Sequence, residues 1–136
     1  MTRNLMLAAT LALLSAPAYA EGDPAQGEDD FKRCKSCHAI ASAEETIVKG
    51  GKTGPNLFGV IGRTAGTVED FKYGADLVKA GEAGLVWDEA SLAAYIEDPK
   101  AFLQEYLDDG SAKSKMTFKL KKNTADMAAY LATFSE

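Results

Sequence analysis

Apolar residues in this 136-residue chain recur mostly at helical spacing. The C-terminal stretch is the clearest example, because a cap at Asn123 or Thr124 precedes an apolar stripe. The stripe has i, i+3, i+4 and i+7 spacing and consists of Met127, Tyr130, Leu131 and Phe134. We interpret these side chains as facing the core, so that Met127 is a packing residue.

Another helix is predicted near the beginning of the chain, running towards the two cysteines. Asp23 suits the N-cap, Pro24 the first helical position, and Gln26 follows the cap by three residues. Gly27 costs about 1 kcal/mol relative to Ala inside a helix. Because Gly27 and Phe31 share a face, either another helix crosses closely there or the glycine merely frays the first turn.

The second half of the chain predicts two further helices. Residues 88–97 carry an apolar stripe behind a cap at Asp88, and Pro99 ends this helix. Residues 100–107 form a shorter helix. By contrast, residues 39–81 contain eight glycines, which makes long helices unfavourable. So long a loop is uncommon in a compact all-α domain, and a central cofactor would account for it.

Residues 1–20 have the pattern of a secretory signal peptide. Arg3 precedes an apolar run over residues 5–14, and Ala18-Tyr19-Ala20 matches a cleavage site. A retained membrane anchor is the alternative, but the run is shorter than the ~20 residues that span a bilayer. We therefore expect an exported protein with one mature domain, residues 21–136.

The mature domain is acidic. Without Arg3, the 15 basic residues fall to 14 against 20 acidic ones, a formal charge of −6. This charge argues against nucleic acid as a general partner. Residues 113–122 nevertheless contain no acidic residue and five lysines, Lys113, Lys115, Lys119, Lys121 and Lys122.

The two cysteines and the one histidine of the chain form a single motif, Cys34-Lys35-Ser36-Cys37-His38. In a helical turn, their side chains stand at i, i+3 and i+4 and share a face. Two thiols can then add to the two vinyl groups of a porphyrin while the imidazole reaches its iron. This pattern therefore indicates covalent c-type haem attachment.

Three other uses of the motif fit the sequence less well. A thioredoxin-like redox pair needs a strand–helix–strand setting, and no segment nearby has a strand pattern. A closed structural zinc site needs four Cys or His ligands, whereas the chain has three such residues. A plain disulfide leaves unexplained why His38 directly follows the second cysteine.

The second axial position of a His38-bound iron decides the function. The candidates are a methionine, a lysine, water or no ligand, and the mature domain has two methionines. Met127 belongs to the apolar stripe, whereas Met116 lies in a polar loop that has no stripe. Met116 is therefore the better candidate, and a loop methionine packed against the haem is the alternative.

With these motifs in this order, the whole mature chain closely resembles the class I cytochromes c, specifically the periplasmic cytochrome c2 type in its long subtype. The class II four-helix-bundle cytochromes carry the haem motif near the C-terminus instead. The segments that carry the resemblance are residues 34–38, 52–63, Trp87, residues 95–100, 115–118 and 128–131.

The resemblance implies the class I fold, in which the N- and C-terminal helices cross and short helices and loops surround one haem c. Cys34 and Cys37 would attach the haem, and His38 and Met116 would be the iron ligands. Pro55 would accept, through its carbonyl, a hydrogen bond from the other ring nitrogen of His38.

Further residues would surround the haem. Arg63, Tyr73 and Trp87 would face a propionate, which needs donors when it is buried. Tyr95 would lie near the Met116 sulfur. Ser114 stands where mitochondrial proteins have threonine, and would supply a hydroxyl in its place.

The resemblance implies an electron carrier rather than an enzyme, because His and Met ligation raises the reduction potential and leaves no position for a substrate. This periplasmic monomer would accept electrons from the cytochrome bc1 complex and pass them to a photosynthetic reaction centre or terminal oxidase. The lysines of residues 113–122, with Lys35 and Lys52, would orient a negatively charged partner at the haem edge. The competing function is a haem enzyme or gas sensor in which Met116 does not bind.

Overall fold

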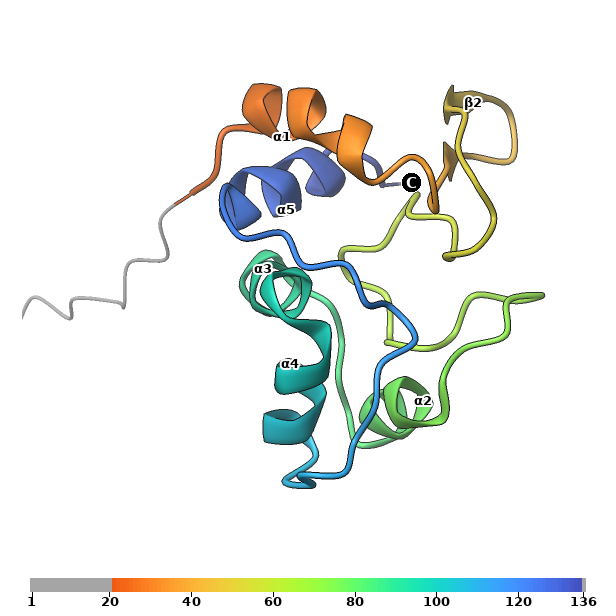
Figure 1. Ribbon diagram of the computed structural model, residues 1–136. Helices are drawn as coiled ribbons and strands as arrows, with labels where there is room; N and C mark the ends of the chain where they lie inside the picture. Colours follow the sequence, from red (N-terminus) through yellow and green to blue (C-terminus); the bar gives the residue numbers. More distant parts are fainter. Residues whose placement is uncertain (1–20, 136) are drawn as a thin grey trace, which may run out of the picture.

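The computed structural model describes residues 21–135, so the predicted signal peptide lies outside the described residues. Within this range the chain is mainly helical (Figure 1). Its helices are α1 (Pro24–Asp30), the 3₁₀-helix η1 (Phe31–Arg33), α2 (Ala75–Glu82), α3 (Glu89–Glu97), α4 (Pro99–Tyr106) and α5 (Thr124–Ala132). Two short antiparallel strands, β1 (Ile40–Ala41) and β2 (Thr46–Val48), form a hairpin. None of the described helices is long and apolar enough to cross a membrane.

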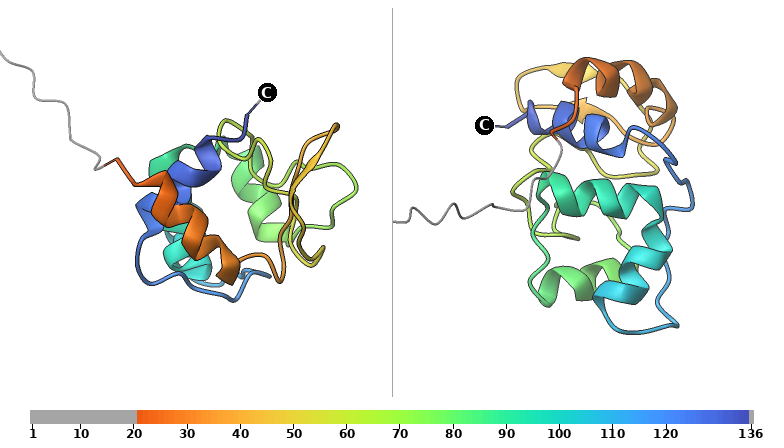
Figure 2. Two further views of the ribbon diagram at one scale, coloured as in Figure 1. Left: turned by 90° about the horizontal axis from the view of Figure 1, so that it is seen from above. Right: turned by 90° about the vertical axis from the view of Figure 1, so that its left-hand side faces the viewer.

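The first and last helices pack across each other at one end of the domain (Figures 1 and 2). A Cβ atom on Gly27 would overlap the carbonyl oxygen of Asp126 and lie 2.6 Å from the Cβ of Tyr130. The Phe31 and Tyr130 rings lie 5.7 Å apart, centroid to centroid. The closely crossing helix predicted from Gly27 is therefore confirmed.

Aspartate caps begin three of the helices. Asp23 accepts a hydrogen bond from the backbone of Ala25, and Asp88 forms a reciprocal capping box with Ser91. Pro99 ends α3 and is also the first residue of α4, which Asp98 caps. The predicted boundaries of these helices are confirmed to within about a residue.

Helix α5 begins where predicted, but without the predicted side-chain cap. Asn123 occupies the N-cap position, but in the left-handed conformation, with φ of 61°, and its side chain makes no capping bond. Its amide donates instead to the Asp30 carboxylate at 2.9 Å. Asn123 thus connects the two crossing helices rather than capping one of them.

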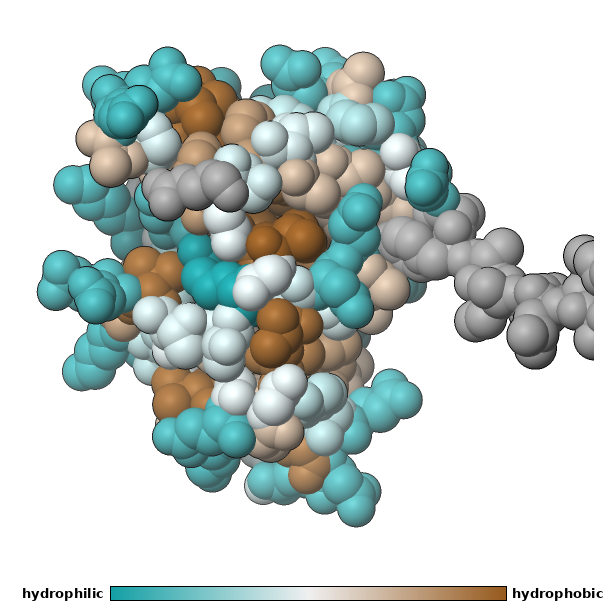
Figure 3. Space-filling view, turned by 180° about the vertical axis from the view of Figure 1, so that it is seen from behind, coloured by the Kyte–Doolittle hydropathy of each residue, from teal (hydrophilic) through white to brown (hydrophobic). Residues whose placement is uncertain are grey.

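The core lies between these helices, and α3 forms the layer next to α5 (Figure 2). Met127 is 2% exposed, which confirms it as a packing residue. Its buried neighbours in the core cluster include Phe31, Leu92, Ile96, Tyr130 and Leu131. On the face shown in Figure 3, hydrophobic side chains are visible in a hollow between hydrophilic groups.

A hairpin of two strands and helix α2, which lie in or at the end of residues 39–81, were not predicted. The expectation that no strand lies near the cysteines is wrong, because β1 begins two residues after His38 and Ile40 pairs with Val48. Strands of two and three residues are too short to show an alternating pattern. Helix α2 escaped prediction because it includes Gly81, where a Cβ atom would overlap the Ala65 carbonyl oxygen. Here glycine permits close packing and does not end the helix.

Candidate functional site

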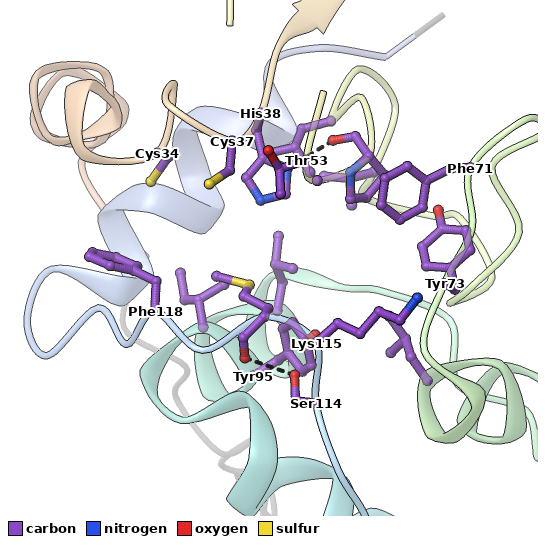
Figure 4. A pocket seen from close by; sticks show the side chains of 18 of the residues that line it. Cys34, Cys37, His38, Thr53, Phe71, Tyr73, Tyr95, Ser114, Lys115 and Phe118 are labelled. Atoms are coloured by element: carbon purple, nitrogen blue, oxygen red, sulfur yellow. Dashed lines mark hydrogen bonds between the residues drawn. The ribbon is translucent and has the colours of Figure 1, made fainter. Parts of the chain in front are cut away.

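A cavity of about 650 Å³ lies between segments that are far apart in the chain (Figure 4). Much of its wall is apolar, with Phe31, Leu57, Val60, Leu77 and Leu92 among the lining residues. The structure brings all ten predicted site residues together around this cavity. They are Cys34, Cys37, His38, Pro55, Arg63, Tyr73, Trp87, Tyr95, Ser114 and Met116.

The two thiols and the imidazole lie along one wall of the cavity (Figure 4). Helix η1 ends at Cys34, and the chain continues as a helical turn in which the His38 N–H donates to the Cys34 carbonyl at 3.0 Å. Both thiols are free. Cys37 is exposed, whereas Cys34 is half-buried, and burial raises the pKa of its thiol to about 11.

His38 is oriented by backbone groups. Its Nδ1 lies 2.8 Å from the carbonyl oxygen of Pro55, so the proton on Nδ1 is donated to that carbonyl and the lone pair remains on Nε2. Burial lowers the pKa of His38, and the weaker effect of the Pro55 hydrogen bond acts in the opposite direction. A Cβ atom on Gly54 would overlap the ring and lie 2.6 Å from Nδ1. The backbone of Gly54 therefore supports the face of the imidazole.

Ser114 and Tyr95 lie on the opposite wall (Figure 4), and Met116 also lines the cavity. Ser114 Oγ donates to the Met116 carbonyl oxygen at 2.9 Å. Burial raises the pKa of Tyr95, which keeps the phenol protonated, and the Ser114 hydroxyl acts on this pKa in the opposite direction. Trp87 packs with its ring 4.9 Å from that of Tyr95.

Arg63 brings a positive charge to the cavity. Its Nη1 donates to the carbonyl oxygens of Asn56 at 3.2 Å and Phe58 at 3.4 Å. Burial lowers the pKa of Arg63, and the nearby Tyr73 acts in the opposite direction, but a guanidinium stays protonated in either case. The Tyr73 hydroxyl accepts a hydrogen bond from the Val68 N–H at 3.1 Å. Its own proton is thus available to a second acceptor.

The lysines of residues 113–122 differ in their surroundings. Lys113 and Lys115 line the cavity, and the Lys115 ammonium lies 3.4 Å from the Lys72 carbonyl oxygen. Lys119 forms an ion pair with Asp98 at 3.2 Å. Part of the positive charge expected along this segment is therefore already compensated within the chain.

Several lining residues were missed in the sequence. Phe71 lies in the glycine-rich loop and Leu77 in the unpredicted α2. Leu77, Ala80 and Gly81 do have i, i+3, i+4 spacing, so a helical pattern was present there. Phe118 was recognised only as part of a motif, whereas its ring lies under the Arg33 guanidinium, 5.5 Å from the ring centroid.

These residues fit a c-type haem by their chemistry. Two thiols and an imidazole nitrogen lie on one wall, and the thioether of Met116 lines the same cavity. An apolar lining with a few convergent polar groups is typical of a cofactor site. The guanidinium of Arg63 is able to bind a carboxylate such as a propionate.

The chain is similar to bacterial cytochromes along nearly its whole length. No family model matches the sequence. It is 58% identical to a cytochrome c-551 of Roseobacter denitrificans, over 99% of this chain and 97% of that protein. It is 54% identical to a cytochrome c2 of Rhodobacter capsulatus, over 94% of this chain and 95% of that protein.

Solved structures of bacterial cytochromes c2 and c-550 are also similar to this chain. A structure of cytochrome c2 from Rhodobacter capsulatus superposes with a TM-score of 0.81, covering 82% of this chain and 97% of that one at 54% identity. A structure of ferric cytochrome c-550 from Paracoccus versutus also superposes with a TM-score of 0.81. The superposition covers 84% of this chain and 98% of that one, at 51% identity. Both the identity and the superposition confirm the class I fold. The chain belongs to the cytochrome c2 family of class I c-type cytochromes.

Proposed function

We propose that this protein is a periplasmic electron carrier with one haem c attached through Cys34 and Cys37. The observation that carries the proposal is the arrangement of the cavity. The two thiols and the free Nε2 of His38 lie on one wall, and Met116 lines the same cavity two residues after Ser114, which lies on the other wall (Figure 4). The relatives named cytochrome c2 and c-550 are electron carriers, which supports the same function.

His38 and Met116 would be the two axial ligands. Pro55 holds the His38 ring through Nδ1, and Ser114 holds the backbone of Met116. When bound, the haem supplies an iron that alternates between the ferric and ferrous states, at a potential raised by His and Met ligation. If His38 and Met116 both bind the iron, no coordination position would remain for a substrate. Such a site would serve a carrier and would not suit a haem enzyme or gas sensor.

Arg63, Tyr73 and Trp87 would face a haem propionate. The guanidinium of Arg63 is already fixed by two carbonyl groups, and the Tyr73 hydroxyl keeps a proton to donate. Both groups are therefore preorganised for an anion and need little rearrangement to bind it. A buried propionate would otherwise be costly.

The proposed partners are membrane electron-transfer complexes. The cytochrome bc1 complex would be the donor, and a photosynthetic reaction centre or terminal oxidase the acceptor. Lysines of residues 113–122, with Lys35 and Lys52, would orient these partners at the haem edge. Residues 1–20 would direct export and be removed, which would leave residues 21–136 as a monomeric domain in the periplasm.

The absorption spectrum of the ferric protein tests the ligand assignment. The wild type should show the near-infrared charge-transfer band of an iron–thioether bond, and Met116→Ala should lose it. Met127→Leu is the matched control, because it replaces a packing methionine and should keep the band. A high-spin ferric spectrum in the wild type, with rapid carbon monoxide binding after reduction, would instead support the enzyme or sensor function.

A further inference from the structure

Asp76 makes a contact that neither helix capping nor a surface ion pair explains. It lies in the first turn of α2, yet its Oδ2 accepts a hydrogen bond from the backbone N–H of Lys113 at 2.8 Å, across 37 residues of chain. The side chain is only 17% exposed. Its other oxygen lies 3.5 Å from the Lys79 ammonium, which is 63% exposed. The contact with the Lys113 backbone is thus the shorter and better shielded of the two.

Lys113 begins the Met116 segment, which we define as residues 113–120. A second contact lies close to the first, because the Lys115 side chain passes over Gly74 and its ammonium lies 3.4 Å from the Lys72 carbonyl oxygen (Figure 4). The other end of the segment is held where the Leu120 N–H donates to the Ile96 carbonyl at 2.8 Å. The segment is therefore anchored at both ends, by α2 and by α3.

The middle of the segment is held by surface contacts. Thr117, Phe118 and Lys119 are exposed. This part of the segment contacts the rest of the chain through the Lys119–Asp98 ion pair and the Phe118–Arg33 contact. The hydroxyl of Ser114 that holds the Met116 backbone belongs to the segment itself. A loop with exposed residues and few anchors opens more readily than the core. A hydrogen bond from a backbone N–H to a carboxylate is stronger than one to a neutral acceptor. The Asp76 contact therefore limits how often the first end of this segment detaches.

We propose that Asp76 is a positioning residue that keeps the Met116 thioether at the iron by anchoring the backbone of Lys113. The inference rests on the proposed function, in which Met116 is an axial ligand. Asp76 does not itself line the cavity, and its contact is with the backbone of Lys113. It acts on the equilibrium between a closed segment, with Met116 bound, and an open segment, with that iron position free.

Added imidazole measures this equilibrium in the ferric holoprotein, because imidazole binds iron only where Met116 has left. Asp76→Ala should raise the apparent affinity for imidazole about tenfold, the effect expected for a lost charge-assisted hydrogen bond. Asp76→Asn keeps a neutral acceptor and should give a smaller increase. Glu82→Gln is the matched control, since it removes an exposed carboxylate from the same helix and should leave the affinity unchanged.

A purely structural role for Asp76 is tested in the Met116→Ala background. There the iron position is already open, so adding Asp76→Ala should not change imidazole affinity further. The far-ultraviolet helical signal of the single variant should match that of the wild type. Equal imidazole affinity in wild type and Asp76→Ala, or a tenfold increase that persists in the Met116→Ala background, would overturn the inference alone. Both this inference and the proposed function would be overturned by one pair of results. The wild type would lack the iron–thioether band, and Met116→Ala would leave its affinity for imidazole unchanged.

Discussion

At the residue scale, backbone atoms orient the proposed haem ligands. The Pro55 carbonyl sets the tautomer of His38, and Gly54 lies directly against its ring. A backbone carbonyl keeps its position when side chains change, so the direction of the Nε2 lone pair depends on the course of residues 54–55. Substitutions that move this stretch should therefore disturb the ligand even though they remove no functional group.

We expect Gly54→Ala to lower the free energy of unfolding of the holoprotein by about 1–3 kcal/mol, the usual cost of overpacking. The added methyl group would overlap the His38 ring and push it away from Pro55. Guanidinium chloride unfolding measures the change. Gly110→Ala is the control, because a Cβ atom there meets nothing within 4 Å. Equal losses in the two variants would contradict this account of Gly54.

Some of these residues could be predicted from the sequence, and others could not. Cys34, Cys37 and His38 were recognisable because covalent attachment requires them to be near neighbours in the chain. Pro55 and Arg63 were expected only through resemblance to a family. The contact of Asp76 with a backbone N–H 37 residues away follows no spacing rule, since only the folded chain brings the two together.

At the element scale, helices were predictable where their start has distinctive chemistry. Asp23, Asp88 and Asp98 each cap a helix with a side-chain oxygen, and each precedes an apolar stripe or a proline. Helix α2 has Gly74 at its N-cap, which offers no side chain, and the hairpin strands are too short to show an alternating pattern. These elements depend on tertiary packing, which a local pattern does not record.

The Asp88 cap gives α3 a pH-dependent contribution to stability. Hydrogen bonds from Ser91 lower the pKa of Asp88, so its stabilising effect is complete above the unfolded-state pKa of about 4 and disappears as the pH falls through the lower folded-state value. Asp88→Ala should therefore cost about 1 kcal/mol at neutral pH. The cost should shrink as the folded-state carboxyl becomes protonated.

Urea unfolding of the holoprotein at neutral pH and at about pH 3 measures this difference. Asp88→Asn is the control, because asparagine caps about as well as aspartate and does not titrate. The stability difference between Asp88→Asn and Asp88→Ala should therefore not change with pH. A constant cost of Asp88→Ala at both pH values would show that the carboxylate charge is not what stabilises α3.

At the scale of the whole molecule, a large cavity adjoins the hydrophobic core. Its volume is about 650 Å³, and core residues such as Leu92, Met127 and Leu131 border it. A domain of this size buries a limited apolar area, and an open cavity removes contacts from the side chains around it. We therefore expect a haem that fills the cavity to contribute much of the stability.

We expect a Cys34→Ala, Cys37→Ala variant, purified without haem, to be largely unfolded. Circular dichroism at 222 nm should show little helix and no cooperative thermal transition. The haem-loaded wild type, measured under the same conditions, serves as the control. A sharp thermal transition in the haem-free variant would mean that the helices hold together without the cofactor.

Charge on the Met116 segment should govern docking. Lys119→Gln should slow electron transfer to a negatively charged partner at low ionic strength, because it removes attraction at the proposed haem edge. The effect should be modest, since Asp98 already compensates part of that charge, and it should fade as salt rises. Stopped-flow measurements over a range of salt concentrations provide the rates. Lys49→Gln is the control, because Lys49 is exposed, follows β2 and does not line the cavity. This variant should transfer electrons at the wild-type rate.

The crossing of α1 and α5 also implies an order of events when the chain folds from its N-terminus. Gly27 packs against Tyr130, so α1 would lack its packing partner until about a hundred further residues had been added. Until then, the cysteine motif that follows η1 would stay outside the folded domain, and the Cys34 thiol would be as accessible as that of Cys37. The packing that half-buries Cys34 would come afterwards. A fold that joins its two ends last would thus leave both thiols open to covalent attachment of the proposed haem.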